Sequence, residues 1–219
     1  MQLYKYCTAQ NLSRVLDQGC IRLGTLADYA KTSAYGDMVS DSHEGTKVVS
    51  GRVVKVTEST SPHSPEMRSL KSMGIELHAS SGGTIQNIVF EHARVRSPNV
   101  LVFSASSEYS PGVHDQWKAA EGYDSCYQIT SARLFYRAIS AALGPEFSFL
   151  GAAPIVYEDD LNLSDPRAAT HPAFVKRKGT FATQSEFRAV WAARSLRDLT
   201  PILIESSGAK LYARTHPST

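Results

Sequence analysis

The stretch that decides the fold runs over residues 174–192 and reads FVKRKGTFATQSEFRAVWA. From residue 181 onward it alternates: the odd-numbered positions are aromatic, small or hydroxyl-bearing, whereas Gln184, Glu186 and Arg188 occupy even-numbered positions. A period of two residues is typical of a β-strand, whose successive side chains point to opposite faces. The pattern therefore predicts a strand over 181–191 with one charged face.

The charged face of this strand allows two interpretations. Gln184, Glu186 and Arg188 lie between a basic cluster at 176–178 and an apolar run at 190–192, and a polar triplet that enters a buried strand is a candidate site. The alternative is an edge strand whose solvated face carries one Glu186–Arg188 pair, because isolated charged triplets are usually solvated. Both interpretations stay open at the level of sequence.

Length and composition bound the class of protein. A chain of 219 residues with 42% hydrophobic residues can form one domain with a sizeable core. We expect a single domain over 1–219 with a surface insertion around 58–83, rich in Ser, Thr, Pro and Gly, that holds a short helix near 66–72. The formal net charge of +2 gives no overall reason to expect nucleic acid or an anionic membrane as a partner.

Cysteine usage and hydropathy bear on the compartment. Cys7, Cys20 and Cys126 are odd in number and lack C-x-x-C spacing, which argues against a disulfide framework and a structural zinc site. No export signal is visible, and no stretch approaches 18 uninterrupted apolar residues. We therefore expect a cytoplasmic protein with no membrane span.

The order of the predicted elements indicates an α+β fold. A strand over 3–7, a helix capped by Thr8 and ended by Gly19, and a strand over 21–26 open the chain. Strands then predominate, interrupted by a core helix over 131–143. The apolar stripe of that helix consists of Leu134, Phe135, Ala138, Ile139, Ala142 and Leu143. Runs of strands with segregated helices favour α+β over a doubly wound sheet, and the dinucleotide, triphosphate and serine-hydrolase fingerprints are missing.

The polar and aromatic stretch over 28–45 has no sustained period and predicts a long loop. Long loops inside compact domains are usually functional, so this one is a candidate lid or substrate loop. It contains Asp37, Asp41, His43 and Glu44, whose spacing matches neither an EF-hand nor a helical H-E-x-x-H motif. We therefore expect no metal site.

A second informative stretch begins at the buried strand over 100–106. It ends with Ser104 and Ser106, and the ends of buried strands in open sheets often carry function. The alternative is that both hydroxyls bond neighbouring backbone at a turn. Tyr109 and Trp117 follow and supply aromatic rings close to this end of the strand.

Three short motifs resemble those of the ADP-ribosyltransferase superfamily. The opening L-Y-K-Y at 3–6, with N-L at 11–12 and G-x-I at 19–21, is similar to its first strand, helix and second strand. The F-S-A-S at 103–106 and the Q-S-E at 184–186 look like its second motif and its [Q/E]-x-E motif. Over most of its length the chain is also similar to a large uncharacterised bacterial family that opens with L-Y-K-Y, has a central W-x-x-Y, and ends on K-x-x-x-W-x-x-E-x-E-x-R. Some relatives of that family neighbour abortive phage-resistance genes.

The resemblance implies split antiparallel sheets with a few flanking helices, and NAD as the substrate. A carboxylate such as Glu186 can stabilise the oxocarbenium-like state in which the nicotinamide–ribose bond breaks. The residues that the resemblance marks as catalytic are Glu186, Gln184 and Lys5; those that it marks as NAD-binding are Tyr6, Ser104, Ser106, Tyr109, Trp117 and Arg188. The chain departs from the superfamily at Lys5, where Arg or His is usual, and from the bacterial family at Phe181 and Gln184, where Trp and Glu stand.

Two classes of function follow. The first is an NAD-consuming enzyme that transfers ADP-ribose to a protein or nucleic-acid acceptor, or hydrolyses NAD, in a bacterial toxin or phage-defence setting with a cognate antitoxin or defence partner. The second is a non-catalytic binding module, in which Glu186 and Arg188 form a structural ion pair and the basic cluster at 176–178 contacts an acidic or nucleic-acid partner. Convergence of Lys5, Ser104 and Glu186 would favour the enzyme.

Overall fold

The computed structural model describes residues 1–31, 40–57, 59–76, 83–179 and 181–217. The chain forms two compact units, each with its own hydrophobic core. The first unit consists of Met1–Glu44, Asn99–Ile155 and Gly179–Thr219, and the second of Gly45–Pro98 and Val156–Lys178. The single domain over 1–219 stays a prediction, and the described residues of the expected insertion at 58–83 belong to the second unit. No helix among the described residues is both long and apolar enough to cross a bilayer.

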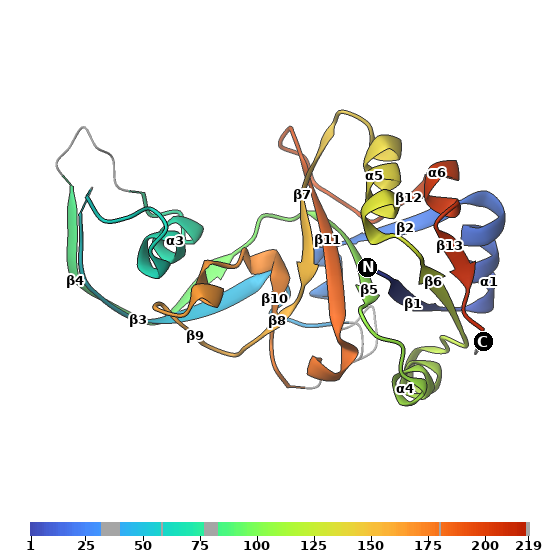
Figure 1. Ribbon diagram of the computed structural model, residues 1–219, viewed down its shortest axis with the longest axis horizontal. Coiled ribbons are helices and arrows are strands. Elements are labelled where there is room, and N and C mark those ends of the chain that lie inside the picture. The colour runs from blue at the N-terminus through green and yellow to red at the C-terminus, as the bar shows by residue number, and fades with distance from the viewer. Residues whose placement is uncertain (32–39, 58, 77–82, 180, 218–219) are drawn as a thin grey trace. The chain divides into compact units, whose positions relative to one another are not determined.

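The first unit is built on an antiparallel sheet (Figure 1). Its strands follow the order β12-β2-β5-β1-β6-β13, and β11 pairs with both β5 and β7. The strands are β1 (Leu3–Cys7), β2 (Cys20–Thr25), β5 (Leu101–Ser106), β6 (Ser125–Ile129), β7 (Phe147–Pro154), β11 (Glu186–Ala193), β12 (Ile202–Glu205) and β13 (Ala213–Thr215). Together with its helices, this sheet confirms the predicted α+β class.

Strands β1 and β2 diverge along one edge of β5. Strand β11 pairs with all of β5, from Leu101 to Ser106, and so occupies one edge of β5. The other edge of β5 is left to β1 and β2. Strand β2 pairs there at Leu101 and Val102, whereas β1 pairs at Ser106. The hydrogen-bonded ladder on this edge is therefore interrupted at residues 103–105, next to Ser104.

The opening strand–helix–strand unit forms as the sequence predicts. Helix α1 (Ala9–Ser13) is capped by Thr8, whose hydroxyl accepts a hydrogen bond from Asn11 N at 3.2 Å, and continues as a π-helical turn η1 (Arg14–Gln18). Gly19 ends the turn at φ +69°, in the left-handed region that favours glycine. A Cβ at this position would lie 2.5 Å from Ser206 O, so the close approach of the two segments also requires glycine.

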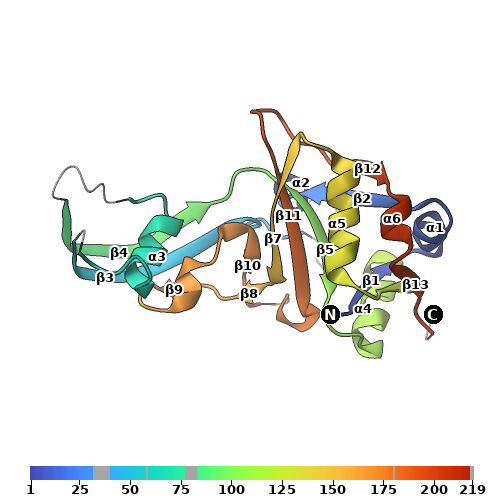
Figure 2. The ribbon, with the colours of Figure 1, turned by 45° about the horizontal axis from the view of Figure 1, so that its top comes forward.

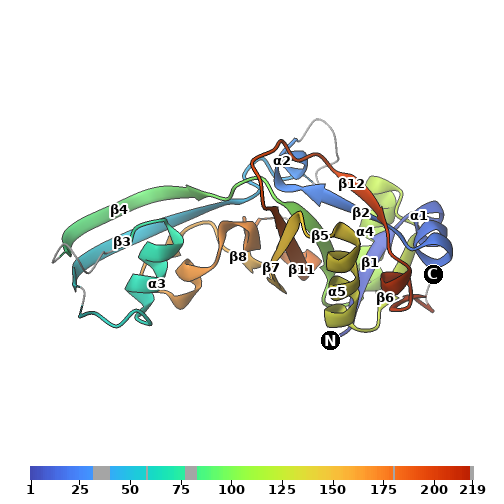
Figure 3. The same cartoon turned by 90° about the horizontal axis from the view of Figure 1, so that it is seen from above.

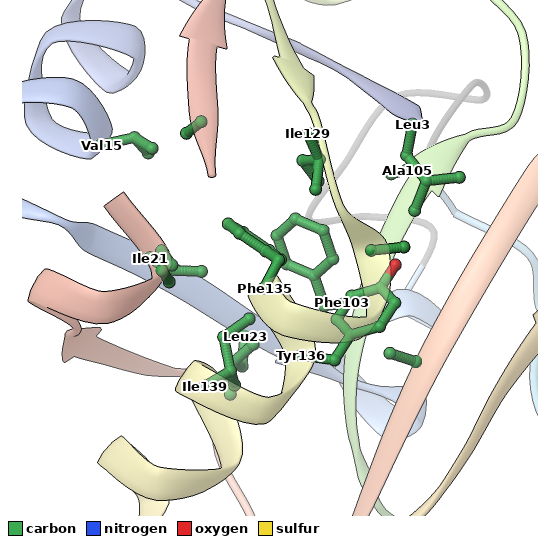
Figure 4. Close-up of a cluster of buried hydrophobic side chains, with 14 of the residues drawn as sticks. Leu3, Val15, Ile21, Leu23, Phe103, Ala105, Ile129, Phe135, Tyr136 and Ile139 are labelled. Carbon is green, nitrogen blue, oxygen red and sulfur yellow. The ribbon is translucent and has the colours of Figure 1, made fainter. Parts of the chain in front are cut away.

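Helix α5 (Ala132–Leu143) lies on the core face of the sheet together with α6 (Ser207–Lys210) (Figures 2 and 3). Phe135 and Ile139 are fully buried, as the predicted stripe requires. The stripe is rotated relative to the prediction, because Tyr136 is buried whereas Ala142 is exposed. Figure 4 shows Phe135, Ile139 and Phe103 within one cluster of apolar side chains between helix and sheet. The helix therefore belongs to the core.

Strand β11 differs from the predicted strand in two ways. It begins at Glu186 rather than at residue 181, because Ala182–Gln184 form a short 3-10 turn (η5) and Ser185 takes a left-handed φ of +46°. It is also a central strand, paired with β5 on one edge and β7 on the other. Phe187, Ala189 and Trp191 contribute to the core, and the charged face is buried as well. The interpretation as an edge strand with a solvated face is therefore wrong.

The second unit is organised on the ribbon of β3 (Thr46–Thr57) and β4 (Thr84–Arg96), with α3 (Pro65–Ser72) on one side (Figure 3). Its smaller elements are β8 (Val156–Tyr157), β9 (Leu161–Asn162), β10 (Val175–Lys176), η3 (Pro166–Ala169) and η4 (Pro172–Phe174). Val49, Val53 and Leu161 are among its buried core residues. The helix predicted near 66–72 is present as α3, whereas residues 58 and 77–82 of the expected insertion lie outside the described part of the chain.

The first unit also carries α2 (Leu26–Tyr29) and α4 (Pro111–Glu121). Helix α4 carries Trp117, and Ser110 caps the helix by accepting a hydrogen bond from Val113 N at 3.4 Å. Helix α2 falls at the start of the stretch 28–45 that the sequence predicts as a loop. Residues 32–39 of that stretch lie outside the described residues, so the lid stays a prediction.

Candidate functional site

The pairing of β5 with β11 brings the predicted serines and charged residues onto one face of the sheet. Ser104 lies opposite Arg188 and Ser106 lies opposite Glu186 in the antiparallel register. Directly opposed residues of paired strands point to the same side. The hydroxyl of Ser104 accordingly donates a hydrogen bond to Glu186 Oε1 at 2.5 Å.

Glu186 and Arg188 belong to a buried ionic triad whose third member is Glu44. The Nε and Nη2 atoms of Arg188 both lie 2.8 Å from Glu186 Oε1, and its Nη1 atom lies 2.5 Å from Glu44 Oε1. All three side chains are almost completely buried. Burial disfavours the charged guanidinium, but the two carboxylates outweigh it and raise the pKa of Arg188. The cation therefore stays charged and holds both carboxylates in place.

Lys5 reaches the same place from β1. Its Nζ donates to the carbonyl oxygen of Ser104 at 2.7 Å, where the ladder between β1 and β5 is interrupted. The ammonium also lies 5.5 Å from the centre of the Phe103 ring. Burial lowers the pKa of Lys5, and the Glu186 carboxylate opposes that shift. Ser104 thus contacts both residues, Glu186 through its hydroxyl and Lys5 through its backbone carbonyl, whereas the Lys5 side chain starts from the opposite face of the sheet.

Ser106 and Gln184 have a different local environment. The Ser106 hydroxyl lies 2.6 Å from Glu108 O and 2.9 Å from Gln184 O, so its single proton serves backbone carbonyls. The sequence predicted that Gln184 lies on the strand. In the structure it is buried in the 3-10 turn that precedes β11. For Ser106, these contacts are those expected of a hydroxyl that stabilises a turn.

The aromatic residues predicted to bind NAD gather around Tyr6. Tyr4 lies opposite Ser106, so Tyr4 and Tyr6 share the sheet face of Ser104 and Glu186. The Tyr6 ring stacks with His114 at 5.6 Å and with Trp117 at 6.5 Å between ring centres. Tyr109 lies 6.1 Å from Tyr6 and stacks on His216 at 4.0 Å. Tyr6, Tyr109 and Trp117 therefore form one cluster.

Two residues at the site were missed at the level of sequence. Glu44 completes the ionic triad, although no motif marks it. Tyr29 packs against Gly24 so closely that a Cβ on the glycine would lie 2.5 Å from the phenol oxygen. Burial raises the pKa of Tyr29 to about 12; Arg22 opposes the shift and Glu186 adds to it. The sequence did hold a signal for Tyr29, namely Gly24. An isolated glycine in a strand often marks a place where another group packs closely against the backbone.

The acidic residues that the structure describes in the stretch 28–45 do not gather around a metal position. Asp37 lies outside the described residues, Glu44 pairs with Arg188, and Asp41 accepts from His43 N at 2.9 Å. Within the described ranges, no group of three or more His, Cys, Asp or Glu side chains is placed to hold a metal ion.

The basic cluster at 176–178 belongs to the second unit. Lys176 is buried, whereas Arg177 and Lys178 are exposed. The surface part of the cluster is therefore limited to Arg177 and Lys178.

No family model, no curated protein and no solved structure matches the chain.

Proposed function

We propose that the protein is an NAD-consuming enzyme of the ADP-ribosyltransferase type, with its reaction centre at Glu186, Ser104 and Lys5. It transfers ADP-ribose to a protein or nucleic-acid acceptor, or hydrolyses NAD, in a bacterial toxin or phage-defence setting. The observation that supports the proposal is that Ser104 joins the other two residues: its hydroxyl donates to Glu186, and its carbonyl accepts from Lys5 at the interruption between β1 and β5.

The chemistry assigns a role to each charged group. The C–N bond between ribose and nicotinamide breaks with its electron pair going to the nicotinamide nitrogen, and positive charge develops on the ribose. Glu186 stabilises that charge as a carboxylate. Water or an acceptor hydroxyl then attacks the ribose carbon and loses its proton.

The neighbours of Glu186 hold its carboxylate in place. The guanidinium of Arg188 lies 2.8 Å from Glu186 Oε1. The Ser104 hydroxyl fixes the same oxygen at 2.5 Å. Lys5 holds the Ser104 carbonyl and acts as a positioning residue. The role of the Tyr6, Tyr109 and Trp117 cluster is to stack on the nicotinamide or adenine ring.

One observation favours the alternative, a non-catalytic binding module. Glu186 is only 6% exposed, and its paired oxygen already accepts from Ser104 and Arg188. A buried triad of this kind also serves to hold β11 in register, as structural ion pairs do in some proteins. In that case the exposed Arg177 and Lys178 are the remaining candidates for contact with an acidic partner.

Incubation of the protein with labelled NAD and a cell lysate tests the proposal. An enzyme releases nicotinamide; a hydrolase does so without labelling any acceptor, whereas a transferase labels a protein or nucleic acid. The Glu186→Gln protein should lose this activity. The matched control is Glu146→Gln, because the Glu146 side chain is 69% exposed and its ion pair with Arg197 lies at the surface. Folded wild-type protein that releases no nicotinamide in lysate would leave the binding module as the better account.

A further inference from the structure

A cavity of about 500 Å³ lies between α5 and β7 in the first unit. Tyr136, Phe149, Ala152 and Phe187 supply much of its apolar wall. Its volume lies in the range of small-molecule sites, which are mainly apolar with a few polar groups that orient the ligand. The cavity is separate from the proposed reaction centre, since Phe187 and Glu186 are neighbours on β11 and point to opposite faces of the sheet.

Phe149 gives this cavity an apolar surface that water still reaches. The Phe149 side chain stands on the edge strand β7, and the residue is 46% exposed. Its ring lies 5.3 Å from Trp191 and 6.5 Å from Tyr136, so it forms the outer part of an aromatic cluster. An apolar ligand in the cavity would remove this surface from water, which is favourable.

Two arginines supply the charge at the cavity. Arg133 and Arg137 line it from α5, and residues four apart lie one above the other on the same helix face. Both are exposed, and neither forms an ion pair with any residue that the structure describes. None of the Asp and Glu residues that the structure describes lines the cavity. Two unneutralised guanidinium groups beside an apolar wall match an anion, because arginine binds carboxylate and phosphate groups through paired hydrogen bonds.

The Tyr136 hydroxyl adds a polar group in the same neighbourhood. It is buried and has no hydrogen-bond partner among the described residues. Buried hydroxyls are normally paired, so an unpaired one needs a reason. Burial raises the pKa of Tyr136, so the phenol keeps its proton and remains a donor.

We propose that this cavity binds an amphiphilic anion, namely an apolar chain or ring that carries one carboxylate or phosphate group. The apolar part packs against Phe149, Ala152 and Phe187, and the anionic group pairs with Arg133 and Arg137. The proposal does not depend on NAD chemistry, because none of these residues belongs to the proposed reaction centre.

Competition binding tests the proposal on the full chain. The probe is 8-anilinonaphthalene-1-sulfonate, an apolar ring system with one anionic group, and the competitors are dodecanoate, dodecyl phosphate, dodecanol and inorganic phosphate. Both dodecyl anions should displace the probe, dodecanol should do so at least about tenfold more weakly, and inorganic phosphate should have no effect. The preference between the two anions identifies the head group. Equal competition by dodecanol would overturn the role of the arginines.

Three variants locate the site. Replacing both Arg133 and Arg137 by Ala should weaken dodecanoate binding by roughly ten- to a hundredfold, the range of lost charge-assisted hydrogen bonds. The matched control is Arg94→Ala with Arg96→Ala, two exposed arginines of the second unit. Ala152→Leu should fill the cavity and weaken all dodecyl ligands, and Phe149→Ala at its exposed position provides a second test of the wall. Wild-type affinity in the folded arginine double variant, or in both wall variants, would contradict the proposal.

Discussion

Ser104 and Glu186 are joined by a hydrogen bond of 2.5 Å although 82 positions separate them in the sequence. The antiparallel pairing of β5 with β11 brings them together, because it places Ser104 opposite Arg188, two residues beyond Glu186 and on the same face. The hydroxyl donates to the same carboxylate oxygen that Arg188 binds. The contact thus couples a proposed catalytic carboxylate to the register of two central strands.

Replacing Glu186 by Gln should reduce both activity and stability. The loss of the carboxylate removes the group that stabilises the developing positive charge, so NAD turnover should fall by about 10²–10³-fold. Arg188 keeps Glu44 as a partner, so the free energy of unfolding should fall by only about 1–3 kcal/mol. Nicotinamide release and urea denaturation measure the two effects, with Glu146→Gln as the control. An unchanged turnover in a folded Glu186→Gln protein would exclude Glu186 as the catalytic group.

Replacing Arg188 by Ala should be more damaging to the fold than replacing either carboxylate. It leaves Glu44 and Glu186 buried without the cation that both of them bind. Breaking a buried pair in this way typically costs about 3–5 kcal/mol. Urea denaturation of Arg188→Ala, Glu44→Gln and Glu186→Gln ranks the three. If Arg188→Ala lowered the free energy of unfolding least among the three variants, the triad would not be what stabilises this face of the sheet.

Gly24→Ala should displace Tyr29. The new methyl group would lie 2.5 Å from the phenol carbon and oxygen, so the ring must move away from the strand. Overpacking of this kind costs roughly 1–3 kcal/mol. The double variant Gly24→Ala with Tyr29→Ala should be less destabilised than the sum of the two single variants, because the clash is gone. Strict additivity in thermal or urea denaturation would show that the two residues do not press on each other.

Lys47 should make the stability of the second unit depend on pH above 8. Its buried Nζ donates to Ser72 Oγ at 2.7 Å, Ala168 O at 2.6 Å and Thr170 O at 2.9 Å. Burial lowers the pKa of Lys47 to about 8 from an ordinary value of 10.5. Between pH 8 and pH 10.5 the unfolded chain binds a proton that the folded chain has lost. The free energy of unfolding should therefore rise with pH across this range.

The comparison of wild type with Lys47→Met isolates that effect. Methionine does not titrate, so the stability of the variant relative to wild type should fall by roughly 1–3 kcal/mol between pH 7.5 and pH 10. Lys55→Met is the control, since Lys55 is exposed on the same strand. Parallel pH profiles for wild type and Lys47→Met would show that burial does not shift the lysine.

Phe135→Ala should strongly destabilise the first unit. Phe135 is fully buried and packs at 5.3 Å from the Phe103 ring, so its truncation leaves a cavity in the core. The expected cost is about 3–5 kcal/mol. Leu211→Ala is the control, because Leu211 is 72% exposed and should cost far less. Equal urea midpoints for Phe135→Ala and wild type would contradict the assignment of α5 to the core.

Local patterns in the sequence determined most of the secondary structure. The N-cap at Thr8, the stop at Gly19 and the apolar stripe around Phe135 and Ile139 predicted α1 and α5, because capping and helical periodicity depend only on residues a few positions apart. Alternation also predicted which face of β11 carries Phe187 and which carries Arg188. The same alternation extended the strand too far, since nothing local revealed the left-handed turn at Ser185.

Only the tertiary structure decided what the charged face of β11 does. Burial of Glu186 depends on β5 and β7 pairing along both edges of the strand, and those partners lie far away in the sequence. Glu44 joins Arg188 from 144 positions away, and Lys5 meets Ser104 from 99 positions away. A residue pattern records which side chains share a face of one element, whereas strand pairing decides which elements meet. The physical reason is that side-chain direction is a property of the local backbone, but burial and electrostatic partners are properties of the packed chain.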